Sequence, residues 1–189
     1  HPFLSDAPYI STLINNPNHI GCHTLGKSES FFKGTQLLEQ EVIEICGRDI
    51  LKGDFEQLDG YVASGGTEAN LQAIWVYRNM YIKKFGASLN EIAILSSNDT
   101  HYSVDKASNI FQIQLFKARV EEDTRALNSD SIEQVLDRIQ NAGVKYLIVF
   151  GNMMTTMFGS VDKVDLYTDA IKKRGLEFRL HIDGAYGGF

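Results

Sequence analysis

A glycine-rich turn lies in the first half of the chain, within the stretch YVASGGTEAN from Tyr61 to Asn70. A short apolar run precedes Gly65 and Gly66, and a helical pattern begins near Thr67. Such a turn lets backbone approach an anion while the N–H groups of the first helical turn and the Thr67 hydroxyl point at it. The turn therefore predicts a phosphate site, and a tight strand-to-helix connection without a ligand is the alternative.

Three further groups of polar side chains each follow a strand-like run. His101 comes after IAILSS, the hydroxyl pair Thr155 and Thr156 comes after KYLIVF, and Asp183 ends FRLHID with Ala185 two residues later. Ligands in open α/β sheets bind at the carboxyl ends of strands, so we expect these residues to surround one edge of a sheet. The alternatives are a loop or capping histidine, a loop whose methionines fill core, and an aspartate that caps a helix.

The string GCHTLGKS, residues 21–28, matches the Walker A pattern letter for letter. A phosphate-binding P-loop needs a buried strand before it and a helix that begins at the lysine. Here NNPNHI precedes the string, and Gly34 interrupts the segment that follows. We therefore reject a P-loop, interpret His19 and His23 as loop residues, and predict no metal site.

Short β-rich runs alternate with helical patterns from residue 60 onward, which is typical of an α/β fold with a mostly parallel sheet and helices on both faces. The predicted strands are 60–64, 92–96, 112–116, 145–150 and 177–183, and the predicted helices are 67–84, 102–110, 130–142 and 163–174. Gly86, Gly143 and Gly175 suit helix C-termini, and Asp130 with Glu133 suggests a capping box.

The first third of the chain is organised differently. Residues 35–50 place Leu38, Val42, Ile45 and Cys46 on one face of a packing helix, whereas residues 1–34 carry all three prolines and read as an arm or loop segment. We therefore predict two parts, the arm 1–34 and a large domain over 35–189.

Composition excludes several classes of partner and compartment. The formal net charge is -6 with a pI near 5.3, and there is no basic stripe, so nucleic acid is not an expected partner. No apolar stretch approaches the roughly 20 residues that span a bilayer, and no membrane association is expected. Two cysteines without a CxxC pair favour a reducing compartment, so we expect a cytoplasmic protein.

The four motifs SGGTEAN, HYSVDKA, TTMFGSVD and HIDGAYGG occur in this order. Together they resemble the large domain of fold-type I pyridoxal 5′-phosphate enzymes, and specifically the group II amino-acid decarboxylases. The resemblance implies that residues 35–189 are the cofactor-binding large domain, incomplete at its C-terminal end. In this family the Schiff-base lysine lies a few tens of residues after the aspartate, so we expect this chain alone to lack full turnover. It also implies a homodimer.

The resemblance assigns a role to each candidate residue. Gly65, Gly66 and Thr67 would hold the cofactor phosphate, and His101 would stack on one face of the ring with Ala185 under the other. Asp183 would pair with the ring nitrogen and favour its protonated form. Thr155 or Thr156 would hydrogen-bond near the phenolic oxygen or the substrate carboxylate. His101 and Asp183 are thus the expected catalytic residues.

The implied reaction is decarboxylation of an L-amino acid to an amine and carbon dioxide. The substrate would be histidine, glutamate or an aromatic amino acid, and the HYSVDKA and TTMFGSVD loops look closer to histidine decarboxylases. The alternatives are another fold-type I enzyme, an aminotransferase or carbon–carbon lyase, and a non-catalytic subunit with the same fold.

Overall fold

The computed structural model describes residues 33–188 and divides the chain into two compact units, 1–63 and 64–189, which are taken separately below. The Walker-like string 21–28 and the histidines His19 and His23 lie outside the described residues. No helix among the described residues is long and apolar enough to cross a membrane.

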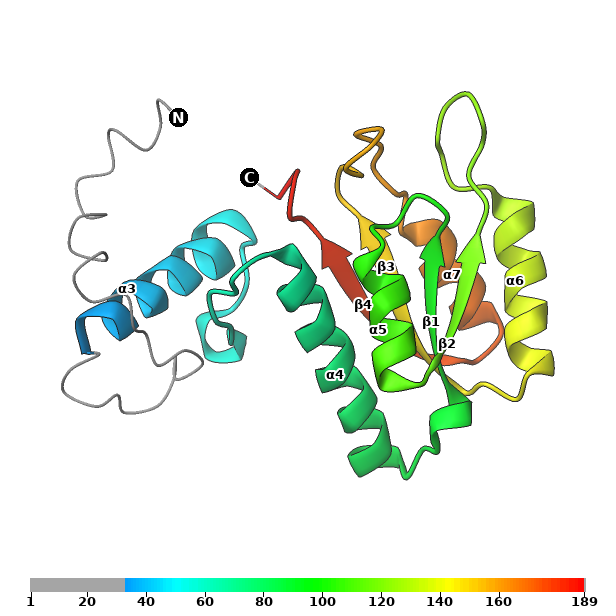
Figure 1. Ribbon diagram of the computed structural model, residues 1–189, viewed down its shortest axis with the longest axis horizontal. Helices are drawn as coiled ribbons and strands as arrows, with labels where there is room; N and C mark the ends of the chain where they lie inside the picture. Colours follow the sequence, from blue (N-terminus) through cyan, green and yellow to red (C-terminus); the bar gives the residue numbers. More distant parts are fainter. Residues whose placement is uncertain (1–32, 189) are drawn as a thin grey trace. The chain divides into compact units, whose positions relative to one another are not determined.

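The second unit is built on a four-stranded sheet whose strands β1 (Ile92–Ser97), β2 (Gln114–Ala118), β3 (Tyr146–Asn152) and β4 (Glu177–Asp183) all run parallel. The strand order is β2-β1-β3-β4, so the chain crosses over the sheet between strands (Figure 1). Four of the five predicted strands are therefore confirmed. Because they are parallel, their carboxyl ends meet at one edge.

Helices connect these strands and cover both faces of the sheet. The helices are α4 (Gly66–Phe85), η4 (Leu89–Glu91), α5 (Ser103–Phe111), α6 (Ser129–Asn141) and α7 (Asp165–Lys173). On one face, Ile74 and Tyr81 of α4 and Val104 of α5 pack on Ile94 and Phe150 of the sheet. On the other face, residues of α6 and α7 pack on alternate strand residues such as Leu95, Leu147 and Val149 (Figure 1). Burial on both faces explains the continuous apolar runs of β1 and β3.

The helix ends follow ordinary capping chemistry, with one difference from the prediction. Gly86, Gly143 and Gly175 have φ angles of 67°, 75° and 68°, the left-handed conformation expected of glycines after a helix. The predicted capping box at Asp130 is wrong, because α6 begins one residue earlier. The Asn128 side chain is the cap and accepts a hydrogen bond from the Ser131 N–H at 2.7 Å, which leaves Asp130 within the first turn.

The first unit contains α3 (Lys33–Glu44), its π-helical continuation η2 (Ile45–Ile50) and the short η3 (Phe55–Gln57). The predicted strand 60–64 is wrong, since the Val62 N–H donates to the Glu39 carboxylate at 2.7 Å rather than to a neighbouring strand. Within the described residues, the face of α3 that is predicted to pack is largely exposed. Leu38 is 64% exposed, whereas Glu39, which accepts that bond, is 6% exposed.

Tyr81 provides a test of this packing. Its side chain is fully buried, its hydroxyl donates to the Leu147 carbonyl at 2.7 Å, and burial raises the pKa of that hydroxyl. We expect Tyr81→Phe to lower the free energy of unfolding by about 1 kcal/mol, because one buried hydrogen bond is lost. Urea denaturation followed by circular dichroism measures this. The control Tyr102→Phe, at a site 62% exposed, should change it by less than about 0.5 kcal/mol.

Candidate active site

A cavity of about 290 Å³ opens at the carboxyl edge of the sheet. Seven of the eight predicted site residues line it: Gly66, Thr67, His101, Thr155, Thr156, Asp183 and Ala185. Gly65, the eighth, is the N-cap residue of α4, directly before this lining. The fold thus brings together residues from four separate connections, and the volume is close to the lower end of the usual range for small-molecule sites.

The glycine turn places the N-terminus of α4 at the cavity. Gly66 and Thr67 begin the helix and line the cavity, so the positive end of a 20-residue helix is directed there. Glu68 fixes the turn by accepting from both the N–H and the hydroxyl of Ser64, at 2.8 and 2.5 Å. A Cβ added to Gly66 would lie 3.1 Å from the Ala185 Cβ, so small residues at both positions keep this part of the cavity open.

Asp183 ends β4, and each of its carboxylate oxygens has a partner. One oxygen accepts from the backbone N–H of Ala185 at 3.1 Å, and the other accepts from the amide of Asn70 at 2.8 Å. A carboxylate has lone pairs for further donors, so a protonated ring nitrogen in the cavity would find an acceptor here. The residues present therefore fit a pyridinium group.

His101 follows β1 and is held by the first turn of α5. Its Nδ1 lies 2.9 Å from the Ser103 hydroxyl and 3.2 Å from the Ser103 backbone N–H, and its ring centroid lies 4.2 Å from that of Tyr102. These contacts fix the orientation of the imidazole. The ring is partly buried and borders the cavity.

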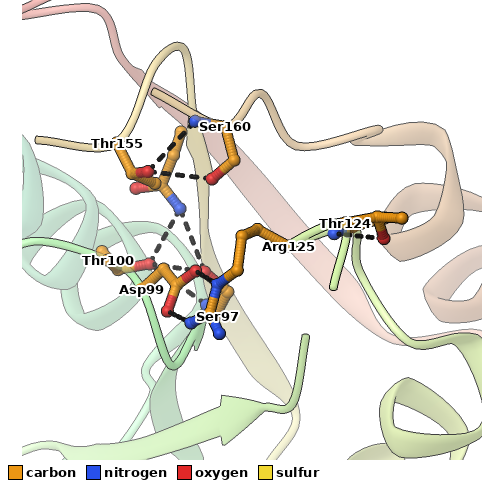
Figure 2. Close-up of polar contacts among 9 residues, drawn as sticks. Ser97, Asp99, Thr100, Thr124, Arg125, Thr155 and Ser160 are labelled. Carbon is orange, nitrogen blue, oxygen red and sulfur yellow. Dashed lines mark hydrogen bonds and ion pairs between the residues drawn. The ribbon is translucent and has the colours of Figure 1, made fainter. Parts of the chain in front are cut away.

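The two threonines after β3 differ in their surroundings. Thr155 is 4% exposed and uses its hydroxyl within its own loop, where it lies 2.8 Å from the Ser160 hydroxyl and accepts from the Ser160 N–H (Figure 2). Thr156 is exposed and borders the cavity. Thr155 thus closes the loop, which leaves Thr156 as the better placed hydroxyl for a ligand.

A buried polar cluster lies beneath this loop. The Asn152 side-chain amide donates to Asp162, Thr100 and Ser97, at 2.6, 3.0 and 3.2 Å. Asp162 also accepts from the Asn152 backbone N–H at 2.9 Å, and burial raises the pKa of its carboxyl. The cluster joins the end of β3 to the turn before His101, so it supports two of the loops that line the cavity.

Arg125 ties these loops from outside the cavity. Its guanidinium makes two hydrogen bonds to Asp99, one of them 2.9 Å long (Figure 2). It also lies 4.1 Å from the centre of the Phe158 ring. The bonds to Asp99 raise the pKa of Arg125. The Asp99 side chain is only 6% exposed. One side chain thus links the turn that carries His101 to the loop that carries Thr156.

Sequence reasoning missed Asn70, Asn152, Ser103, His181 and Arg125. Asn70 and His181 stand within the motifs SGGTEAN and HIDGAYGG, so these motifs could have indicated both residues as candidates for the site. The partners of Arg125 lie on other loops, and no local pattern marks it. Among the described residues, no group of three or more histidines, cysteines and acidic residues could hold a metal ion.

The sequence pattern described as "Pyridoxal-dependent decarboxylase conserved domain" matches residues 19–189. The chain belongs to this family. It is 47% identical over 189 residues to the tryptophan decarboxylase of Clostridium sporogenes (strain ATCC 15579), and the match covers all of this chain and 45% of that protein. The chain thus spans less than half the length of this relative.

Solved structures show the same fold. Sphingosine-1-phosphate lyase Bpss2021 of Burkholderia pseudomallei K96243 superposes with a TM-score of 0.70 at 19% identity, over 97% of this chain and 40% of that one. Mouse CSAD in apo form gives a TM-score of 0.66 at 24% identity, over 80% and 32%. The parallel α/β fold is therefore confirmed, and the family match confirms the predicted family.

The Arg125 contacts lead to a testable expectation. We expect Arg125→Ala to speed amide hydrogen exchange roughly three- to tenfold in the segments 98–101 and 155–159, because both loops lose a shared anchor. Hydrogen exchange with mass spectrometry measures these rates. Lys145→Ala is the matched control, since it removes an ion pair with Glu91 next to the amino ends of the strands. Equal protection in the Arg125 variant and the parent chain would contradict the expectation.

Proposed function

We propose that this chain forms the pyridoxal 5′-phosphate site of an amino-acid decarboxylase. The strongest support is one cavity at the carboxyl edge of the sheet, which is lined by a helix N-terminus, an imidazole, a hydroxyl and a carboxylate. Membership of the pyridoxal-dependent decarboxylase family supports the cofactor. We assign the phosphate to Gly65, Gly66 and Thr67.

We further propose what the other residues do in that site. His101 and Ala185 take the two faces of the ring, and Thr156 rather than Thr155 donates to the ligand. When bound, the cofactor supplies a pyridinium that accepts the electron pair left when carbon dioxide departs. Asp183 keeps the proton on the ring nitrogen, because an opposite charge at short range stabilises the cation.

The proposed substrate is an aromatic L-amino acid, which the protein converts to the corresponding amine. The 47% identity to a tryptophan decarboxylase supports this class over histidine or glutamate. Because the chain spans 45% of that relative, the reaction is proposed for the protein that carries this chain.

We also propose that this protein is a homodimer in the cytoplasm. The family resemblance supports the dimer, and two cysteines without a CxxC pair suit a reducing compartment. Light scattering coupled to size-exclusion chromatography measures the assembly, and a monomeric mass would overturn this part.

Ala185→Leu tests the cofactor site directly. A larger side chain at this lining position, close to Gly66, would occupy the space assigned to the ring. We expect the Kd for pyridoxal 5′-phosphate, followed by absorbance titration, to rise at least about tenfold, since ring and side chain cannot share that volume. Ala142→Leu, at an exposed position after α6, is the control and should bind like the parent chain. Equal affinity of the Ala185 variant would contradict the assignment.

The reaction is tested with the protein that carries this chain, including any sequence that follows it in its gene. The protein is incubated with L-tryptophan, L-tyrosine, L-histidine and L-glutamate. L-tryptophan or L-tyrosine should yield the corresponding amine and carbon dioxide. A keto acid product would identify an aminotransferase instead. Absence of turnover with all four, in protein that binds the cofactor, would overturn the proposed reaction.

A further inference from the structure

Asn70 connects two of the site residues from a buried position. It lies on α4, one turn after Thr67, and is 3% exposed. Its amide nitrogen lies 2.8 Å from an Asp183 carboxylate oxygen and 3.0 Å from the Ser103 hydroxyl, and its amide oxygen lies 2.9 Å from Nε2 of His181. The side chain thus uses both of its N–H donors and its oxygen.

The direction of each hydrogen bond follows from the chemistry of the partners. An ionised carboxylate only accepts, so the NH₂ group of Asn70 must face Asp183. The amide oxygen therefore faces His181, whose Nε2 must carry a proton and donate. Burial lowers the pKa of His181, which keeps its ring neutral, and the ring is packed 4.5 Å from that of Phe150.

Ser103 connects Asn70 to His101. Because the Ser103 hydroxyl oxygen accepts from Asn70, its own hydrogen is left to donate to Nδ1 of His101. The Ser103 backbone N–H points at the same nitrogen. Nδ1 is then an acceptor, and the neutral His101 ring carries its proton on Nε2.

We infer that Asn70 is a positioning residue that aims the Asp183 carboxylate and, through Ser103, fixes the tautomer of His101. The roles of Asp183 and His101 toward the cofactor rest on the proposed function. The donor series itself, from His181 through Asn70 to Asp183 and Ser103, is a property of this chain. A buried asparagine that only filled space would leave the His101 tautomer unchanged when replaced.

Two variants separate the branches of this series. Asn70→Asp keeps the size of the side chain but replaces the donor with an acceptor, which opposes Asp183 and draws the Ser103 hydroxyl away from His101. Ser103→Ala removes the hydroxyl link between Asn70 and His101 and keeps the backbone N–H that points at Nδ1. Asn79→Asp is the matched control on the same helix, because the Asn79 side-chain oxygen already accepts from Arg78, at 3.0 Å.

The first measurement is the tautomer of His101 in ¹⁵N-histidine-labelled chain, from long-range ¹H–¹⁵N correlation spectra. His101→Gln identifies the signals. At a pH where the ring is neutral, the parent chain and the Asn79 variant should show the Nε2–H form. Asn70→Asp should lower its share, whereas Ser103→Ala keeps the backbone N–H that points at Nδ1 and should lower it less. An unchanged tautomer in Asn70→Asp would overturn the inference. If Asn70→Asp fails to fold, Asn70→Ala, which also removes the donor to Ser103, takes its place with the same expectation.

The second measurement is the Kd for pyridoxal 5′-phosphate. Asn70→Asp should raise it by about tenfold or more, because a hydrogen bond to a charged group is lost, with a smaller rise in Ser103→Ala. The Asn79 variant should bind like the parent chain. If the protein that carries this chain binds no cofactor, the proposed function is defeated, while the tautomer result would still decide the role of Asn70.

Discussion

The parallel pairing of β1, β3 and β4 is the constraint on which the site depends. Register between β3 and β4 places Asn152 beside Asp183, and the Met153 N–H donates to the Asp183 carbonyl at 2.9 Å. Because all the strands point the same way, the segments that follow them must meet at one edge. A slip of one residue in β4 would turn the Asp183 side chain to the other face of the sheet. The position of the Asp183 carboxylate is therefore a consequence of sheet register.

Two buried asparagines connect the ends of β3 and β4 to the neighbouring helix and loops. Asn70 joins α4 to Asp183 and Ser103, and Asn152 joins the end of β3 to Asp162 and Thr100. Buried polar groups destabilise a fold unless they are hydrogen-bonded, so such clusters favour one arrangement of the loops over others. Arg125 adds an outer link between two of these loops. The cavity is thus bordered by groups whose orientation is largely determined before any ligand binds.

Sequence alone was sufficient where the signal is local. The apolar runs of β1 and β3, the glycines that end α4, α6 and α7, and the four ordered motifs predicted the sheet, the helix ends and the family. The prediction of a strand at 60–64 was wrong, because an apolar run does not reveal whether a neighbouring strand is present to pair with it. The capping box at Asp130 failed because the helix boundary lay one residue earlier. The Asn70–Asp183 contact spans 113 residues, so only the folded chain could reveal it.

A crystal structure of the chain with pyridoxal 5′-phosphate would test these assignments in one experiment. We expect a ring between His101 and Ala185, with its nitrogen within about 3 Å of an Asp183 carboxylate oxygen that still accepts from Asn70. We also expect the phosphate at the N-terminus of α4. A ring bound elsewhere, or one whose nitrogen faces away from Asp183, would contradict these assignments.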